Sequence, residues 1–407
     1  MEIAKEGNTS RDHQTEPRDT YKIAYTFHFL FGAGNLLPWN ALITAVDYFN
    51  QLYPSSNHIE RVFSVCYMTS SLLVLSILMN WTHNNNKKKP GSFRLRMNLG
   101  FSMLILTMIL IPLLDWTSHC SRPNIAAYYV TIASVVVCGL ADGLIGGSLI
   151  GSAGNLPKQY MQAIFAGTAS SGILVSMLRI ITKASLPQTP KGLQTSAHLY
   201  FIITTVILLI CIVCCNLLYK LPVMQEHYKL LSDNDSLLSN SRPKFWEVAR
   251  KIRWPAFGVM FIYAVTLSIF PGFISDNNLK STSVKKDWYP VLLITVYNFS
   301  DLVGKCLPAV YVPKGVGKAT WGCIMRVLFY PMFTVCLHGP KWMKTEVPIA
   351  ILTMALGVSN GYLTSVIMMI VPKSVPTSEA EVGAVVMAVS LGIGLVAGSV
   401  LGWFWVI

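Results

Sequence analysis

The stretch YNFSDLVGK, from Tyr297 to Lys305, places an amide, a carboxylate and an ammonium group inside an apolar segment. Asn298, Asp301 and Lys305 are spaced i, i+3 and i+7, so a helix carries all three on one face, with Asp301 and Lys305 as an i,i+4 pair of opposite charge. Ionisable side chains are costly in lipid and mark functional sites there. The stripe predicts a helix that faces a bundle interior or a water-filled cavity. We interpret it as a substrate contact or gate, which does not exclude the simpler role of a clamp between helices.

The composition around this stretch is that of a membrane protein. Of the 407 residues, 53% are hydrophobic and only 13% are charged, against about 25% charged in soluble domains. The apolar residues form blocks of the length that spans a bilayer as a helix, which is about 20 residues. These blocks predict an all-α polytopic membrane protein with eleven spanning helices, at 22–49, 61–81, 95–115, 124–150, 156–182, 196–220, 254–274, 287–311, 316–337, 346–371 and 380–407.

The longest polar gap predicts the domain organisation. Residues 221–253 divide the chain into an N-terminal six-helix bundle at 21–220 and a C-terminal five-helix bundle at 254–407. Residues 1–20 are polar and lack the apolar core of a signal peptide, so we expect a disordered cytosolic tail.

The basic residues predict the orientation. The net charge of +13 comes from Lys and Arg in the gaps between apolar blocks, mostly in the tail and in the loops after every second helix. This bias predicts a cytosolic N-terminus, a cytosolic loop at 221–253 and an extracytosolic C-terminus. We therefore interpret the charge as a topology signal and expect no nucleic-acid partner.

Catalytic motifs are missing from the sequence. It contains no HExxH, no GxSxG elbow and no GxxxxGK[ST] phosphate loop, and its eight histidines are scattered. Eight of the nine cysteines lie in or beside apolar blocks, where we expect them to be reduced core residues. We expect no enzyme, no metal site and no cofactor.

Two further blocks carry charged residues at membrane depth. In ADGLIGGSLIG, Asp142 precedes glycines that favour close helix packing or, alternatively, leave room for a ligand beside Gly147 and the hydroxyl of Ser148. Arg179 either snorkels to the membrane surface or pairs with Asp142 or Asp301, and the same question arises for Arg326.

Helix breakers occur in three blocks. In GNLLPWN (34–40), Pro38 cannot donate a hydrogen bond to the carbonyl of Gly34, which predicts a bend that aims Trp39. Asn40 is predicted to hold a neighbouring helix. Pro271-Gly272 and Asn360-Gly361 are predicted to interrupt two later helices, as lined cavities in transporters allow.

These motifs together resemble the equilibrative nucleoside transporter family. The resemblance rests on GNLLPWN, AGTASSGILVSMLRIITKA, TLSIFPGF, YNFSDLVGK, LGVSNGYLT and Glu381 followed by glycines, in order along the chain. The stretches LRIITKA and DWYPVLLITVYNFSDLVGK are similar to the plant branch. The resemblance implies a six-plus-five, major-facilitator-like arrangement with alternating access about a central site, and nucleosides or nucleobases as substrates.

The family's substrate residues map onto this sequence position by position. The resemblance implies substrate contacts for Leu36, Trp39, Asn298, Asp301 and Lys305. Many relatives carry Gln just before the Gly-Gly or Gly-Ser pair of the fourth helix and use it in nucleobase recognition, where this chain has Gly146, so its substrate range is expected to differ. The expected substrate set also includes Gly147 and Ser148, and Asn40, Asp142, Arg179 and Asn360 are expected to gate or to stabilise the site.

The expected function is nucleoside transport in the plasma membrane, with the vacuolar membrane as the alternative. Facilitated diffusion and proton coupling both stay open, because Asp47, Asp142 and Asp301 lie in or near membrane segments. The expected partners are the substrate, the bilayer and, in the coupled case, protons, with the monomer as the working unit. The alternatives are a carrier for another small polar metabolite and a non-transporting receptor or scaffold.

Overall fold

The computed structural model describes residues 19, 21–53, 58–84, 91–118, 125–227, 229, 245–270, 288–313, 315–340, 343, 345–376 and 379–403. The N-terminal helices are α1 (Ile23–Thr44), α2 (Val46–Leu52), α3 (Ile59–Asn84), α4 (Gly91–Ser118), α5 (Ile125–Asn155), α6 (Lys158–Ser185) and α7 (Pro190–Leu218). The C-terminal helices are α9 (Phe245–Lys251), α10 (Arg253–Ile269), α11 (Tyr289–Cys306), α12 (Val316–Met325), α13 (Phe329–His338), α14 (Glu346–Ile370) and α15 (Ala380–Leu401). Short 3-10 turns follow α11, α12 and α14.

The predicted membrane spans agree with these helices. Within the described residues, nine helical segments are long and apolar enough to cross a membrane, and up to eleven when each sharply bent pair counts as one span. The bent pairs are α1–α2, at 49°, and α9–α10, at 75°. A helix satisfies its backbone hydrogen bonds internally, as lipid requires. The structure therefore confirms the predicted all-α membrane architecture.

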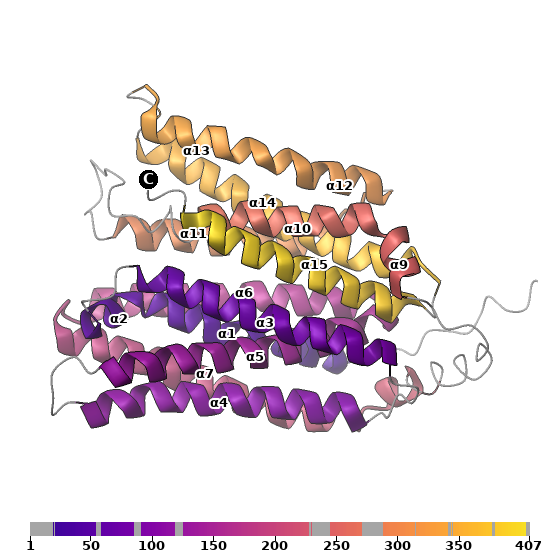
Figure 1. The fold of residues 1–407 in the computed structure, drawn as a ribbon, viewed down its shortest axis with the longest axis horizontal. Coiled ribbons are helices and arrows are strands. Elements are labelled where there is room, and N and C mark those ends of the chain that lie inside the picture. Colours follow the sequence, from indigo (N-terminus) through magenta and orange to yellow (C-terminus); the bar gives the residue numbers. More distant parts are fainter. Residues whose placement is uncertain are drawn as a thin grey trace, which may run out of the picture.

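The helices gather into two groups that lie side by side along the long axis of the molecule (Figure 1). We call α1–α7 the N-half and α10–α15 the C-half. In the N-half, α1 packs on α6 and α7, and α5 packs on α3 and α4; in the C-half, α11 packs on α14, and α10 packs on α15 and α12. Two seams join the halves: α6 lies against α11 and α14, and α15 lies against α3 and α5.

The outer surface is apolar. Large exposed side chains occur along most helices, and examples are Leu106 at 65%, Ile125 at 73% and Ile202 at 59% exposure. Soluble proteins rarely expose apolar side chains on this scale. Their distribution suits a lipid surrounding.

Glycines bring helices into backbone contact at the seams and within each half. A Cβ at Gly167 of α6 would overlap the carbonyl oxygen of Phe29 in α1, and one at Gly361 of α14 would overlap that of Asp301 in α11. Small residues allow such close approach in membranes. These contacts fix which faces of α1, α6, α11 and α14 turn inward.

Of the three helix interruptions predicted from the sequence, two fall inside continuous helices and one lies outside the described residues. Helix α1 continues through Pro38, and the bend falls at Ala45, between α1 and α2. Contacts with α6 on both sides of Pro38, at Gly32 and at Asn40, hold the helix together there. Helix α14 continues through Asn360-Gly361, because this pair packs against α11. Pro271-Gly272 lies outside the described residues.

The predicted loop at 221–253 contains structure as well. Helix α9, from Phe245 to Lys251, lies inside its boundaries and turns sharply into α10. The tail predicted at 1–20 lies outside the described residues apart from Asp19.

Candidate functional site

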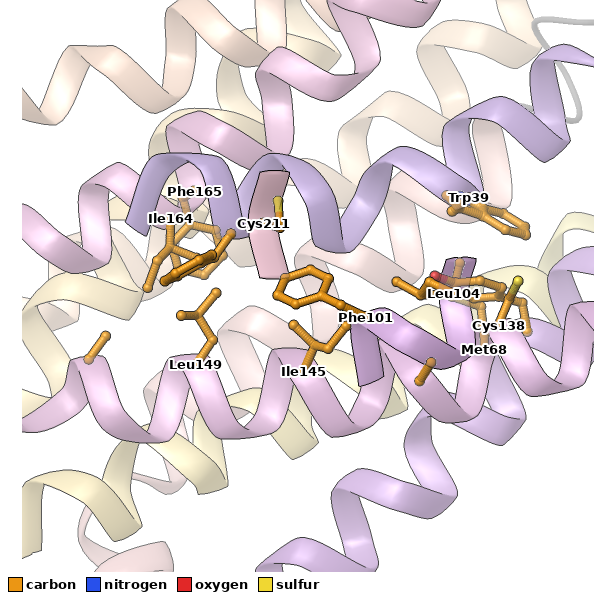
Figure 2. Packing of buried hydrophobic residues seen from close by; sticks show 14 of the residues in the cluster. Trp39, Met68, Phe101, Leu104, Cys138, Ile145, Leu149, Ile164, Phe165 and Cys211 are labelled. Atoms are coloured by element: carbon orange, nitrogen blue, oxygen red, sulfur yellow. The ribbon is translucent and has the colours of Figure 1, made fainter. Parts of the chain in front are cut away.

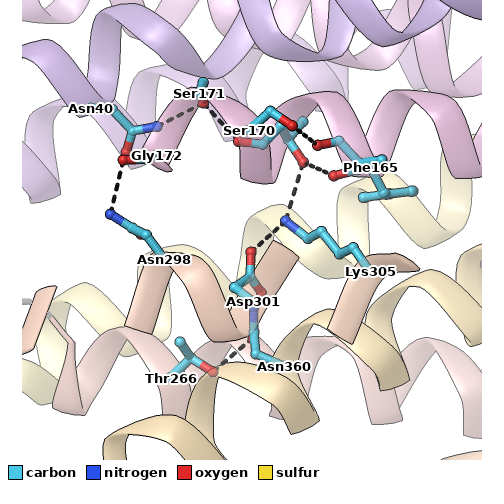
Figure 3. Close-up of polar contacts among 12 residues, drawn as sticks. Asn40, Phe165, Ser170, Ser171, Gly172, Thr266, Asn298, Asp301, Lys305 and Asn360 are labelled. Carbon is cyan, nitrogen blue, oxygen red and sulfur yellow. Dashed lines mark hydrogen bonds and ion pairs between the residues drawn. The ribbon is translucent and has the colours of Figure 1, made fainter. Parts of the chain in front are cut away.

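The stripe on α11 lies at the seam with α6. Asp301 and Lys305 form an ion pair with 2.9 Å between Oδ2 and Nζ, and their residues are 7% and 4% exposed. Lys305 Nζ also donates to Thr168 Oγ1 of α6 at 3.1 Å (Figure 3). The predicted i,i+4 pair is confirmed, and its ammonium group bridges the two halves.

A hydrogen-bond network extends from Asp301 into the C-half. Asn360 Nδ2 of α14 donates to Asp301 Oδ1 at 2.7 Å, and Thr266 Oγ1 of α10 donates to Asn360 Oδ1 at 2.9 Å (Figure 3). Arg326 donates to Thr266 Oγ1 at 2.6 Å and to Ser359 Oγ at 3.0 Å. Arg326 is therefore a buried part of this network and does not snorkel to the membrane surface.

Asparagines hold α6 from both sides. Asn40 Nδ2 of α1 donates to Ser171 Oγ at 2.8 Å, which confirms that Asn40 holds a neighbouring helix. From the C-half, Asn298 Nδ2 donates to the Gly172 carbonyl at 3.2 Å (Figure 3) and to Ser176 Oγ at 2.8 Å. The small face of α6 is thus the surface on which α1 and α11 meet.

Asp142 forms a separate cluster inside the N-half. Its Oδ1 accepts from Asn35 Nδ2 of α1 and its Oδ2 accepts from Ser71 Oγ of α3, both at 2.8 Å. The hydroxyl of Tyr67, also on α3, lies near the same carboxylate but forms no hydrogen bond with it in this conformation. Asp142 and Asn35 both keep some accessible surface. Among the described residues, no Lys or Arg forms an ion pair with Asp142. We call Asn35, Ser71 and Asp142 the Asp142 cluster.

Trp39 lies one helical turn after Asn35. It is 5% exposed and packs against Tyr67 of α3, with 4.7 Å between ring centroids. Figure 2 shows it in the same buried cluster as Met68 and Cys138. Leu36, also on α1, keeps accessible surface.

The glycines of α5 differ in how closely neighbouring helices approach them. A Cβ at Gly147 would press on Leu75 and Leu78 of α3, so this position packs closely against α3. A Cβ at Gly146 would meet only Asn35 Nδ2, at 3.4 Å, so space lies beside it. Ser148 is 4% exposed, and its hydroxyl has no hydrogen-bond partner among the described residues.

Arg179 has a partner that the sequence did not predict. It forms an ion pair with Asp47 of α2, not with Asp142 or Asp301. The Asp47 side chain is 52% exposed, so the pair lies at an end of the bundle. The bend of 49° at Ala45 separates α2, which carries Asp47, from α1.

The sequence patterns did not identify several residues that form hydrogen bonds in these networks, among them Asn35, Ser71, Thr168 and Thr266. Asn35 carried a usable signal, because it lies four residues before Trp39 and therefore on the same helical face. The three hydroxyl residues carried none, since Ser and Thr are frequent in membrane helices.

Comparison with known proteins identifies the relatives of this chain. The family model described as Nucleoside transporter matches residues 132–243 and 229–407. Equilibrative nucleotide transporter 8 of Arabidopsis thaliana is 58% identical over 394 residues, covering 97% of this chain and 98% of the relative. Equilibrative nucleotide transporter 1 of the same plant is 44% identical over 415 residues, covering 99% and 89%.

Solved structures support the fold. A proton:xylose symporter of the major facilitator superfamily superposes with a TM-score of 0.61 at 11% identity, covering 94% of this chain and 86% of that one. The human organic anion transporter MFSD10 gives a TM-score of 0.60 at 13% identity, covering 95% of both chains. With its two halves of membrane helices and its full-length relatives, the chain belongs to the nucleoside transporter family as an integral, multi-pass membrane protein of major-facilitator-like fold.

Proposed function

We propose that this protein carries nucleosides across a membrane by alternating access, with the substrate held between the N-half and the C-half. The observation that carries the proposal is the Asp301–Lys305 pair at the seam, where Lys305 also donates to Thr168 of the opposite half. A substrate that enters here replaces contacts between the halves with contacts to itself. Binding is thereby coupled to the relative movement of the halves.

The chemistry of a nucleoside suits the residues around this seam. Ribose hydroxyls both donate and accept hydrogen bonds, and Asp301 and Lys305 offer an acceptor and a donor to them. When the site is empty, the same groups satisfy each other, so neither is left as an uncompensated charge. Asn298 lies three residues before Asp301 on the same face of α11 and completes this side of the proposed site.

The base needs a flat apolar wall. Trp39 supplies it, with Leu36 on the same helix. In this conformation Trp39 is 5% exposed and packs against Tyr67 of the same half, so a base reaches its ring after the indole or its neighbours in the N-half move. Asn40, Arg179 and Asn360 hold the surrounding helices, whereas the packing of Gly147 against α3 and the position of Ser148 give us no reason to keep these two in the proposed site.

Uptake of labelled adenosine or uridine in a transport-deficient host tests the proposal. We expect uptake that excess unlabelled nucleoside suppresses and excess xylose does not. Asp301→Asn and Trp39→Ala are expected to reduce uptake at equal surface expression. Uptake that ignores unlabelled nucleosides, or full uptake in both variants, would contradict the proposed substrate or site.

The mode of transport is tested in the same cells. We propose a plasma-membrane carrier with a cytosolic N-terminus that works as a monomer. Measuring uptake at two external pH values, with and without a protonophore, distinguishes facilitated diffusion from proton coupling. An epitope tag at either terminus, stained before and after permeabilisation, tests the orientation.

A further inference from the structure

A line of hydrogen bonds crosses the C-half and ends on the Asp301 carboxylate. It begins at Arg326, in the short 3-10 turn between α12 and α13, which donates to Thr266 Oγ1 of α10 at 2.6 Å. Thr266 Oγ1 lies 2.9 Å from Asn360 Oδ1 of α14, and Asn360 Nδ2 lies 2.7 Å from Asp301 Oδ1 of α11 (Figure 3). Each of these residues is at most 7% exposed. We call Arg326, Thr266 and Asn360 the Arg326 line.

The two ends fix the direction of every hydrogen bond between them. A guanidinium only donates, so Thr266 Oγ1 accepts from Arg326. An ionised carboxylate only accepts, and Asp301 is ionised in its pair with Lys305, so the nitrogen of the Asn360 amide faces it. The amide oxygen then faces Thr266, which gives it the hydroxyl proton. The orientation of the amide thus follows from the chemistry of both ends, and each group donates towards Asp301.

Arg326 has no acidic partner of its own. Among the described residues, no Asp or Glu forms an ion pair with it, and its Nε is buried without a hydrogen-bond partner. Its second acceptor is Ser359 Oγ, at 3.0 Å, and Ser359 in turn donates to the Leu356 carbonyl of its own helix. Of the two acceptors, only Thr266 leads on to Asp301. A buried cation in a membrane helix is costly and indicates a functional position.

The Arg326 line holds the carboxylate from within the C-half. The other oxygen of Asp301, Oδ2, is held by Lys305, whose ammonium group also donates to Thr168 of the N-half. These last contacts are the ones that a substrate replaces in the proposed mechanism. The bond from Asn360 to Oδ1 belongs entirely to the C-half, so it remains when the halves move apart and orients Asp301 for the incoming substrate.

We propose that Arg326 and Thr266 are positioning residues for substrate binding: through Asn360 they keep Asp301 turned as an acceptor towards the ribose. This inference rests on the proposed nucleoside transport. Neither residue touches the substrate, because each acts through the next side chain in the line. Breaking a link lets the Asn360 amide rotate and the carboxylate change its orientation, which weakens substrate binding without removing any substrate contact.

Saturation kinetics of nucleoside uptake test the proposal in proteoliposomes that contain the purified full chain, because they separate KM from Vmax. Thr266→Val keeps the shape of the side chain but removes the hydroxyl. We expect KM for labelled adenosine or uridine to rise about fivefold, the effect of roughly one lost hydrogen bond. Thr266→Ser keeps the hydroxyl and should hold KM within about twofold of the wild type. A merely structural role would lower Vmax, through fewer folded carriers, and leave KM unchanged.

Arg326→Lys tests whether the guanidinium acts through Thr266. Lysine keeps the charge but lacks the planar fork that reaches Thr266 and Ser359 together, so we expect KM to rise about threefold. In the double variant with Thr266→Val, KM should rise no further than in Thr266→Val alone. Independent effects would multiply to about fifteenfold.

Thr353→Val is the matched control. Thr353 is a fully buried threonine of α14 whose Oγ1 has no hydrogen-bond partner among the described residues. The same replacement at this position breaks no link of the Arg326 line and should leave KM at the wild-type value.

The outcomes separate this inference from the proposed function. If the wild type takes up no nucleoside, the proposed function fails and this inference fails with it. If the wild type takes up nucleosides but Thr266→Val keeps the wild-type KM, Thr353→Val raises KM as much, or the double variant shows the multiplied effect, positioning by the Arg326 line is wrong. Should Thr266→Val not give monodisperse protein, Thr266→Cys, whose thiol is a weak donor and a weak acceptor, replaces it with the same expected rise in KM.

Discussion

Asp301 and Asp142, which lie inside the helix bundle, occupy different environments. Asp301, in the C-half, is paired with Lys305 and hydrogen-bonded to Asn360. Asp142, in the N-half, is held by neutral amide and hydroxyl groups. Each carboxylate oxygen of both aspartates accepts a hydrogen bond or an ion-pair contact, but only Asp301 faces a cation among the described residues. The same residue type therefore has its charge compensated in one half and is held by neutral groups in the other.

The largest effect should come from removing the cation of the Asp301 pair. Lys305→Met leaves Asp301 buried without its partner, which costs about 3 to 5 kcal/mol of folding free energy. We expect a marked fall in thermal stability of the detergent-solubilised protein and loss of uptake. Asp142→Asn breaks no ion pair and should cost only about 1 kcal/mol.

A double variant separates the structural part of this effect from the functional part. Replacing both partners, with Asp301→Asn and Lys305→Met, removes the uncompensated charge, and the amide introduced at position 301 can still accept from Asn360. We expect most of the stability to return while uptake stays low. Recovery of both would mean that the pair is only a clamp between helices, and equal losses from Lys305→Met and Asp142→Asn would break the comparison between the two aspartates.

The two aspartates also differ in how tightly glycines pack around them. A Cβ at Gly361 would overlap the carbonyl oxygen of Asp301 and lie 2.8 Å from the Lys305 backbone nitrogen. Gly361→Ala must therefore push α14 away from α11, and we expect a loss of about 1 to 3 kcal/mol in folding free energy. Thermal unfolding followed by size-exclusion chromatography measures it.

The matched control is Gly317→Ala in α12, where an added Cβ meets nothing within 4 Å. This variant should unfold at the wild-type temperature. A loss there as large as that of Gly361→Ala would show that any added methyl group is harmful in these helices, and the argument from close packing would fail.

The contrast between the aspartates shows what sequence can predict in such a protein. The stripe on α11 was predictable because all its members lie on one helix at helical spacing. The contacts that give each aspartate its character come from other helices: Thr168 and Asn360 for one side, Asn35 and Ser71 for the other. Helical spacing says which residues share a face, but it does not say which helix that face meets.

Arg179 is a second residue whose partner could not be predicted from the sequence. Its polarity and depth were evident from the sequence, but its partner Asp47 depends on a bend at Ala45 that follows no proline or glycine. Pro38, the residue expected to bend the helix, lies inside continuous α1 between two contacts with α6. The nine to eleven candidate spans of the described residues could be predicted from apolar length, whereas the position of a bend depends on tertiary contacts.

The smallest effect is expected at Gly146, and it is informative because it is small. A Cβ there meets only the end of the Asn35 side chain, at 3.4 Å, and alanine is intrinsically more favourable than glycine within a helix by up to about 1 kcal/mol. Gly146→Ala should therefore unfold at the wild-type temperature or slightly above it, in contrast to Gly361→Ala. If instead the two variants lose similar stability, α5 is as closely packed at Gly146 as α14 is at Gly361.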